Sequence, residues 1–257
     1  MDIPFFWDKP IDIYMPDNIA VEKFVLQRPG GLFSAAIAVV NQPLSVLKDM
    51  RFSFLHKNEL DFLDTIKVSK VQHSYLLGRY AAKSALGAFM DHIILTDVQI
   101  SSGIFQQPVL YLPEGGNIQL SIAHTGEMGM AIVFPEGHPM GVDVETIDPQ
   151  QNETIREVLA SGEQHKLHLI NSDISKSLTL LWTMKEALSK VLKTGLMTPF
   201  HLYEIESVEC KNELVICNFI NFPQYKSLSW ISGKHAWSVV LPRKSVLDTD
   251  MIRRLYL

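Results

Sequence analysis

The strongest chemical signal in the sequence is a short run of alternating acidic and β-branched residues, Gly-Val-Asp-Val-Glu at positions 141–145. The valines predict a β-strand, and successive side chains of a strand point to opposite faces, so Asp143 and Glu145 should project from the same side. Two carboxylates side by side repel each other unless they are solvated or a cation lies between them. Hard oxygens at this spacing suit Mg²⁺, which commonly takes one or two protein carboxylates together with phosphate oxygens. An edge strand with two solvated acids is the simpler interpretation of this strand taken alone.

A helical pattern over residues 178–192 supplies a third carboxylate. Trp182, Glu186 and Lys190 are spaced four apart and share one face, beside an apolar stripe at helical spacing. Glu186 and Lys190 could be no more than a surface ion pair, worth about 0.2–0.5 kcal/mol. If the helix packs on the sheet that carries Asp143, however, the acids and the lysine form a site suited to a metal ion and phosphate.

One histidine belongs to the same hypothesis. His124 lies in the segment His-Thr-Gly-Glu, which we expect to be a sharp turn between strands at residues 118–123 and 128–134. Turn histidines are commonly just solvated, so a functional role for His124 is supported only by the acids and the lysine around it.

The order of the predicted elements repeats along the chain. A shift of 104 positions places the apolar strand at residues 33–40 on residues 137–144, and a shift of 107 places residues 130–135 on residues 237–242. The repeat predicts an α+β protein of two similar halves, each a long helix packed on a small antiparallel sheet, with the site in the cleft between them. We expect an N-terminal extension over residues 1–30, a first half over 31–136 and a second half over 137–257 that carries the acids.

The repeat also indicates that the acids are not required by the fold. At the offset of 104, Val39 and Ala82 of the first half fall on Asp143 and Glu186. Further helices are predicted over residues 52–63 and 71–90, and further strands over residues 99–104 and 108–112.

Composition favours a globular cytoplasmic protein. Hydrophobic residues make up 47% and charged residues 20%, and the net charge of −5 argues against broad binding to nucleic acid or to a membrane surface. The two cysteines, Cys210 and Cys217, provide neither a disulfide framework nor metal-ligand spacing. The first residues lack the basic start of a signal peptide, and no apolar run is long enough to span a membrane.

Three motifs in register carry a family resemblance. The strand Gly-Val-Asp-Val-Glu at 141–145 and the segment Trp-Thr-Met-Lys-Glu-Ala at 182–187, followed by Lys190, resemble the two signatures of the Sfp-type 4′-phosphopantetheinyl transferases. Ser-Ile-Ala-His-Thr-Gly at 121–126 resembles the upstream S-x-S-H segment of that family, and residues 76–83 resemble its first-half helix. The resemblance covers residues 31–242 in order.

The resemblance implies an activity and a metal. Members of the family move phosphopantetheine from coenzyme A to a serine of an acyl- or peptidyl-carrier protein and release 3′,5′-ADP. By this analogy Asp143, Glu145 and Glu186 hold Mg²⁺ on the pyrophosphate of coenzyme A. Glu186 is the favoured base for the serine hydroxyl, and Glu145 is the alternative.

The same analogy assigns the cations. Lys190 should bind a phosphate oxygen and assist catalysis, and His124 and Arg79 should reach the nucleotide phosphates. Lys185 lies about 100° round the helix from Glu186 and could either help to bind phosphate or face solvent. A site built between two halves of one chain needs no second subunit, so a monomer is expected.

The sequence departs from the family pattern at two positions. Ala123 replaces a serine that many members have, and Gln107, before Pro108, replaces the lysine of a G-K-P turn. These departures keep two alternatives open: a catalytically degraded relative that binds coenzyme A or a carrier protein as a scaffold, and a Mg²⁺-dependent phosphodiesterase that uses the same acids.

Overall fold

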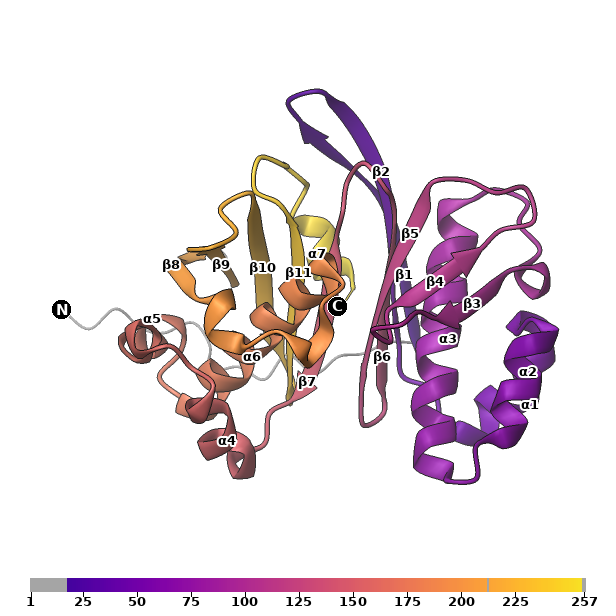
Figure 1. Ribbon diagram of the computed structural model, residues 1–257, viewed down its shortest axis with the longest axis horizontal. Coiled ribbons are helices and arrows are strands. Elements are labelled where there is room, and N and C mark those ends of the chain that lie inside the picture. Colours follow the sequence, from indigo (N-terminus) through magenta and orange to yellow (C-terminus); the bar gives the residue numbers. More distant parts are fainter. Residues whose placement is uncertain (1–17, 212, 256–257) are drawn as a thin grey trace.

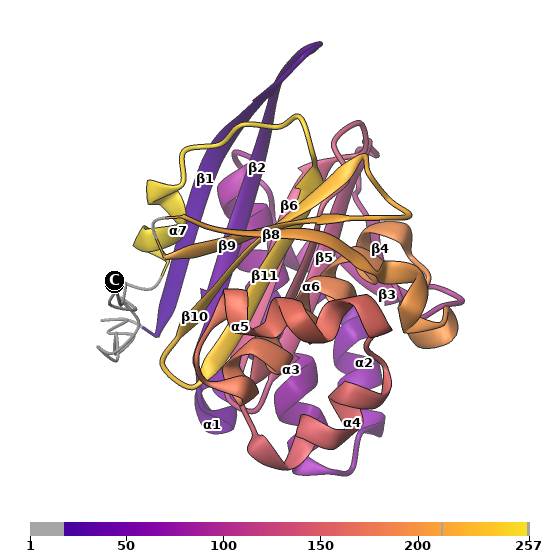
Figure 2. The same ribbon diagram turned by 90° about the vertical axis from the view of Figure 1, so that its left-hand side faces the viewer.

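Two antiparallel sheets face each other, and helices cover the outer face of each (Figures 1 and 2). The computed structural model describes residues 18–211 and 213–255. The first sheet has the order β1 (Ile19–Arg28), β2 (Gly31–Val40), β6 (Met128–Pro135), β5 (Ile118–Thr125). The second has the order β7 (Gly141–Thr146), β11 (His235–Pro242), β10 (Tyr225–Ser232), β9 (Leu214–Phe219), β8 (Ile205–Lys211). The predicted α+β fold of two similar halves is thereby confirmed.

Three apolar cores lie between the layers of sheets and helices. One lies between the two sheets, and the other two lie between each sheet and its helices. The helices of the first half are α1 (Leu44–Phe54), α2 (Lys57–Thr65) and α3 (Ser69–Phe89). Those of the second half are α4 (Asn152–Glu157), α5 (Leu167–Ile170) and α6 (Ile174–Leu192). A separate hairpin of β3 (Gln99–Ser102) and β4 (Pro108–Tyr111) and the short helix α7 (Asp250–Arg254) complete the fold, and none of the helices in the described part is long and apolar enough to cross a membrane.

The internal repeat appears in the structure as matched elements. Strands β5 and β6 begin and end 107 residues before β10 and β11. Each half also buries one glutamate–lysine pair, Glu59 with Lys83 at 2.9 Å and Glu163 with Lys185 at 2.6 Å. When Lys83 is aligned with its equivalent, Lys185, the next residue, Ser84, falls on Glu186. Ser84 rather than Ala82 therefore occupies the position of Glu186, which corrects the helix register inferred from the sequence.

The buried glutamates also explain why one predicted helix is two. The helix expected over residues 52–63 is interrupted where His56 caps the start of α2. Glu59 accepts a hydrogen bond from the His56 backbone N–H at 2.8 Å and a second from the Ile100 backbone N–H at 3.1 Å. Glu163 repeats both contacts with Ala160 and Ile205 at 2.8 Å each. A capping box therefore ends one helix and starts the next, a break that apolar periodicity does not reveal.

Two further expectations are corrected. The extension predicted over residues 1–30 falls partly outside the described residues, and its described part contains β1, which pairs along its whole length with β2. The turn predicted at His124 begins later, because β5 continues to Thr125 and His124 pairs with Gly129 of β6. The division of the chain at residues 136 and 137 stays a prediction.

Helix α6 lies unusually close to β7 at Gly141. A Cβ atom added to Gly141 would overlap the backbone oxygen of Ala187 and would lie 2.8 Å from Cγ2 of Val191. The first residue of the acidic motif is therefore a glycine because the helix backbone leaves no room for a side chain.

We expect Gly141→Ala to lower the free energy of unfolding by about 1–3 kcal/mol, because two packed backbones must separate to admit one methyl group. Urea unfolding followed by circular dichroism measures the change. Gly137→Ala is the matched control, since its added Cβ would meet only the Phe33 ring at 3.8 Å. Equal stability of the two variants would contradict the close contact.

Candidate active site

Strand β7 places the motif acids on the side of α6. Val142 and Val144 are buried in the core between the sheets, as the alternation predicts. Asp143 is only 4% exposed, although β7 is an edge strand of its sheet. The interpretation of two solvated acids on an exposed strand is therefore wrong for Asp143.

Lys190 pairs with Asp143 rather than with Glu186. Its Nζ donates to Oδ1 of Asp143 at 2.8 Å, and the lysine side chain keeps 27% of its surface exposed. The other carboxylate oxygen, Oδ2, is buried without a hydrogen-bond partner. Asp143 thus has one oxygen held by a partly exposed lysine and one oxygen left for another ligand.

Glu145 and Glu186 share the electrostatic field of Asp143. Burial, reinforced by the charges of Asp143 and Glu186, raises the pKa of Glu145 to about 7. Burial and Asp143 likewise raise the pKa of Glu186 to about 7. Lys190 opposes both shifts without cancelling them. The three predicted carboxylates therefore interact in the folded protein, and two of them exchange protons near neutral pH.

His124 lies at the edge of this cluster. Partial burial and the Lys190 cation lower the pKa of His124, while Asp143 acts in the opposite direction. The residue is still exposed, at the end of β5. The structure therefore brings His124 into the electrostatic neighbourhood of the acids and Lys190.

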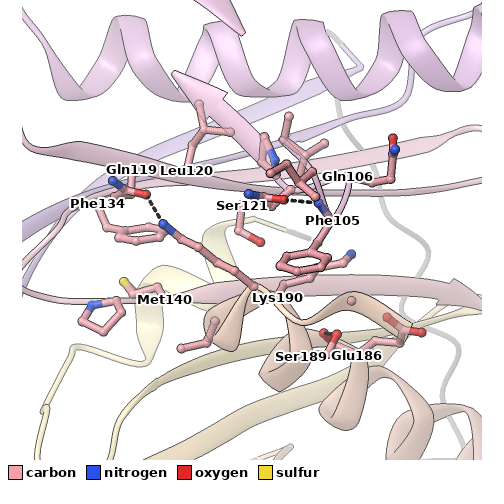
Figure 3. Close-up of a pocket in the computed structure, with 18 of the residues that line it drawn as sticks. Phe105, Gln106, Gln119, Leu120, Ser121, Phe134, Met140, Glu186, Ser189 and Lys190 are labelled. Atoms are coloured by element: carbon pink, nitrogen blue, oxygen red, sulfur yellow. Dashed lines mark hydrogen bonds between the residues drawn. The ribbon is translucent and has the colours of Figure 1, made fainter. Parts of the chain in front are cut away.

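A cavity of about 620 Å³ opens beside the acids, between the two halves. Figure 3 shows Phe105, from the first half, across this cavity from Glu186 and Ser189 of α6. Its walls are largely apolar, and Lys190 and Lys193 bring positive charge. The Lys193 ammonium donates to Gln119 Oε1 at 2.7 Å, which ties the end of α6 to the first half. The predicted cleft between the halves is present, and it contains Glu186 and Lys190.

Two predicted phosphate ligands lie elsewhere. Lys185 is fully buried and paired with Glu163 on the other side of α6, so it neither faces solvent nor can reach the cavity. Arg79 pairs with Glu59 at 3.3 Å and lies over the Tyr75 ring, within a smaller pocket of the first half. Lys185 is therefore not available to a phosphate in the cavity. Arg79 shares Glu59 with Lys83 and lies in a pocket apart from the cavity, and its role as a phosphate ligand stays a prediction.

Ser121 and Thr125 are site residues to which the sequence alone assigned no role. The hydroxyl of Ser121 accepts a hydrogen bond from the Val142 backbone N–H at 3.2 Å, and that of Thr125 accepts one from Thr146 at 3.3 Å. The Thr125 hydroxyl also opposes the rise in the pKa of Glu145. These contacts hold β5 beside β7, and the only signal for them was their place in the segment around His124.

The departures from the family pattern have different consequences. Ala123 packs in the core between the sheets, so its missing hydroxyl is not a missing donor of the cavity. Gln107 closes the turn at the cavity rim, where its Oε1 accepts from the Phe105 N–H at 2.9 Å and its backbone oxygen from Gly103 at 2.7 Å. Gln106 has φ 63°, the left-handed region that glycine favours. This turn brings no cation to the cavity.

The acids suit Mg²⁺ in chemistry but do not form a closed metal cage. Among the described residues, no three His, Cys, Asp or Glu side chains are grouped closely enough to hold a metal ion as they stand. Mg²⁺, however, needs only one or two carboxylates when phosphate and water complete its shell. The partnerless Oδ2 of Asp143 and the mutual repulsion with Glu145 and Glu186 are what a cation would relieve.

Residues 139–240 match the family model described as the 4′-phosphopantetheinyl transferase superfamily. The matched segment contains β7, α6 and β11, and with them all three carboxylates and Lys190. This match agrees with the resemblance noted in the sequence, at the level of the superfamily and over residues 139–240. No curated protein matches the chain.

Solved structures similar to this chain include three holo-acyl-carrier-protein synthases. The enzyme of Bacillus anthracis str. Ames, in complex with CoA (3′,5′-ADP), is 20% identical, with a TM-score of 0.32, and covers 46% of this chain and 95% of its own. The enzyme of Plasmodium yoelii is 22% identical with a TM-score of 0.34, and the match covers 45% of this chain and 96% of that enzyme. The enzyme of Thermotoga maritima is 21% identical with a TM-score of 0.32, and the match covers 47% of this chain and 69% of that enzyme. The match of residues 139–240 is the finding that supports the superfamily.

The raised pKa values predict that the metal-free protein loses stability as the pH rises. In the unfolded chain Glu145 and Glu186 titrate near 4.5, whereas in the folded protein their pKa is about 7. The folded state therefore binds more protons between these values, and stability present at low pH is lost as the pH rises through about 7. The reference protein is the double variant Glu145→Gln/Glu186→Gln, which lacks both titrating groups. Between about pH 5 and 8, the free energy of unfolding of the wild type should fall by about 1–3 kcal/mol relative to that of this variant.

Urea unfolding in EDTA at several pH values measures this difference. His138 and His235, whose pKa is lowered to about 4, contribute the opposite slope, but they are present in both proteins and cancel. A difference between the two proteins that does not change with pH would contradict the raised pKa values.

Proposed function

We propose that the protein transfers 4′-phosphopantetheine from coenzyme A to a serine of an acyl- or peptidyl-carrier protein and releases 3′,5′-ADP. One observation carries the proposal: Asp143, Glu145, Glu186 and Lys190 interact within the segment that matches the superfamily, and Glu186 and Lys190 line the cleft between the two halves. We propose further that the protein is of the Sfp type and acts as a cytoplasmic monomer without nucleic-acid or membrane partners.

Glu186 has the properties of the general base. It lines the cavity, and with a pKa of about 7 it can accept the proton of a serine hydroxyl at neutral pH and hold it while the phosphate bond forms. Glu145 has a similarly raised pKa and is the alternative base. A hydroxyl opposes the pKa rise of each glutamate, Thr125 for Glu145 and Ser189 for Glu186, so the preference for Glu186 as the base rests on its position in the cavity wall.

Lys190 has the position and freedom of a phosphate ligand. Its ammonium neutralises Asp143 in the metal-free protein, and its partial exposure lets it turn toward an anion in the cavity. Mg²⁺, held by Asp143 with Glu145 or Glu186, would neutralise charge on the pyrophosphate. Lys190 would then bind a phosphate oxygen, and His124, beside the acids, would donate to another. The apolar walls would hold the uncharged parts of coenzyme A.

A second candidate is a catalytically degraded relative that binds coenzyme A or a carrier protein as a scaffold. The observation that favours it is the small number of cations at the cavity. Lys190 and Lys193 line the cavity together with Glu136 and Glu186, whereas Arg79 and Lys185 neutralise buried glutamates. A polyanionic substrate would then depend strongly on the metal and on Lys190.

Mass spectrometry of apo-carrier proteins separates the two candidates. A panel from fatty-acid, polyketide and nonribosomal peptide systems is incubated with the protein, coenzyme A and Mg²⁺. The transferase adds one phosphopantetheine to a carrier, whereas a scaffold adds none. Asp143→Asn and Glu186→Gln should abolish transfer yet remain folded, and Glu206→Gln, at an exposed position of β8, should behave as wild type. Addition that survives both site variants would contradict the assigned roles.

We expect Lys190→Ala to lower kcat/KM for coenzyme A by a factor that corresponds to about 2–4 kcal/mol, because it removes a cation that binds charge developing at phosphate. Lys190→Arg should restore part of the activity, since the charge survives while the geometry changes. The rates are measured at fixed carrier and saturating Mg²⁺.

Lys193→Ala is the matched control for Lys190→Ala. Lys193 also lines the cavity but bonds Gln119 rather than an acid of the site. A Lys190→Ala loss below about threefold, under 1 kcal/mol, would remove the phosphate role from this residue. An equal loss in both variants would show a general effect of cavity charge instead.

A further inference from the structure

A second concave site lies where the tip of the β1–β2 hairpin meets the ends of β10 and β11. Its volume is about 410 Å³. Three cations line it, Arg28, Arg243 and Lys244, and no carboxylate is among its lining residues. The rest of the wall consists of Gln224, the ring of Tyr225 and four prolines, Pro29, Pro139, Pro223 and Pro242.

Arg28 is held in place at the wall of this pocket. One guanidinium nitrogen donates to the Gly137 backbone oxygen at 2.8 Å, and the group lies 4.5 Å from the centre of the Phe33 ring. A guanidinium has five N–H donors, so this arrangement fixes its plane and leaves further donors for a ligand. The backbone N–H of Arg243 bonds the Gln224 oxygen at 2.7 Å, which fixes the opposite wall.

The cations of this pocket form no ion pairs with the described residues. Within the part of the chain that the structure describes, no ion pair involves Arg28, Arg243, Lys244 or the neighbouring Lys226. Burial and the charge of Arg243 lower the pKa of Lys226, whose ammonium donates to the Ser245 oxygen at 2.8 Å. In a chain of net charge −5, such a cluster of unpaired cations is a local exception.

We propose that this pocket binds a phosphorylated small molecule, whose phosphate contacts Arg28, Arg243 and Lys244 and whose flat or apolar body rests on Tyr225 and the prolines. Guanidinium groups match phosphate oxygens in pairs, and the pocket volume lies in the range of small-molecule sites. Prolines restrict the backbone, so the wall loses little freedom on binding. A concave site with an apolar floor fits such a ligand better than an extended acidic polypeptide.

The pocket is separate from the carboxylate site and does not depend on the proposed transferase activity. The two cavities share Pro139 in their walls, and none of the acids or Lys190 lines the second pocket. Ligand binding can therefore be measured in a protein whose cleft has lost its own phosphate ligand.

Isothermal titration with pyrophosphate and with 3′,5′-ADP, in Lys190→Met protein at low salt, tests the proposal. We expect binding of at least one probe. The affinity should be at least about tenfold lower when the triple substitution Arg28→Gln/Arg243→Gln/Lys244→Gln is added, since the charge-assisted hydrogen bonds to the phosphate are lost. The matched control is Arg253→Gln/Arg254→Gln, which removes two cations that already form ion pairs on or beside α7. This control should bind as tightly as its parent.

Three outcomes would overturn the proposal: no binding of either probe to the Lys190→Met protein, equal affinity in the triple variant, or equal losses in the triple variant and the control. Binding of poly-glutamate without binding of either phosphate probe would also overturn it, and would indicate a surface for an acidic protein. Thermal unfolding checks that the variants are folded. Arg243→Gln/Lys244→Gln, which changes only two exposed side chains, provides the measurement if the triple variant is not folded.

Discussion

The close approach of α6 to β7 is the constraint on which the site depends. Because the helix backbone lies against Gly141, the turn of α6 that carries Glu186 and Lys190 is held beside Asp143 and Glu145. Three carboxylates in so small a volume would separate or protonate in a looser structure. The packing keeps them together, and the raised pKa values of Glu145 and Glu186 are the electrostatic cost of that packing.

The cleft exists because two edge strands meet without forming one sheet. β5 ends the first sheet and β7 begins the second, and side-chain hydroxyls of Ser121 and Thr125 bridge them where a continuous ladder would use backbone groups. The two sheets can then face each other across an apolar core while their edges diverge. The acids of β7 and α6 lie at that divergence, opposite a turn of the first half that ends in Gln107.

Features with a local period, such as the alternation along a strand, could be predicted from the sequence. Ion pairs between residues far apart in the chain became visible only in the structure. Alternation along β7 was enough to place Asp143 and Glu145 on one face, and the repeat predicted β10 and β11 from β5 and β6. The pairing of Arg79 and Lys185 with buried glutamates was not predictable in this way. Their partners, Glu59 and Glu163, each accept a backbone N–H from three residues earlier, at the start of a helical segment that precedes the long helix. The pattern of a helical face does not reveal such a carboxylate packed against it.

These buried pairs also determine where positive charge remains for ligands. A lysine that neutralises a buried glutamate cannot also bind phosphate, because its removal would leave an unpaired charge in the interior. Each half uses its helix cation in this way, so the cleft retains Lys190 and Lys193 beside several acids. A cleft of this composition would attract a polyanion weakly without a bound metal ion. The metal dependence that we propose for the transfer would then follow from the fold, because the same helices that position the carboxylates use their other cations to stabilise the interior.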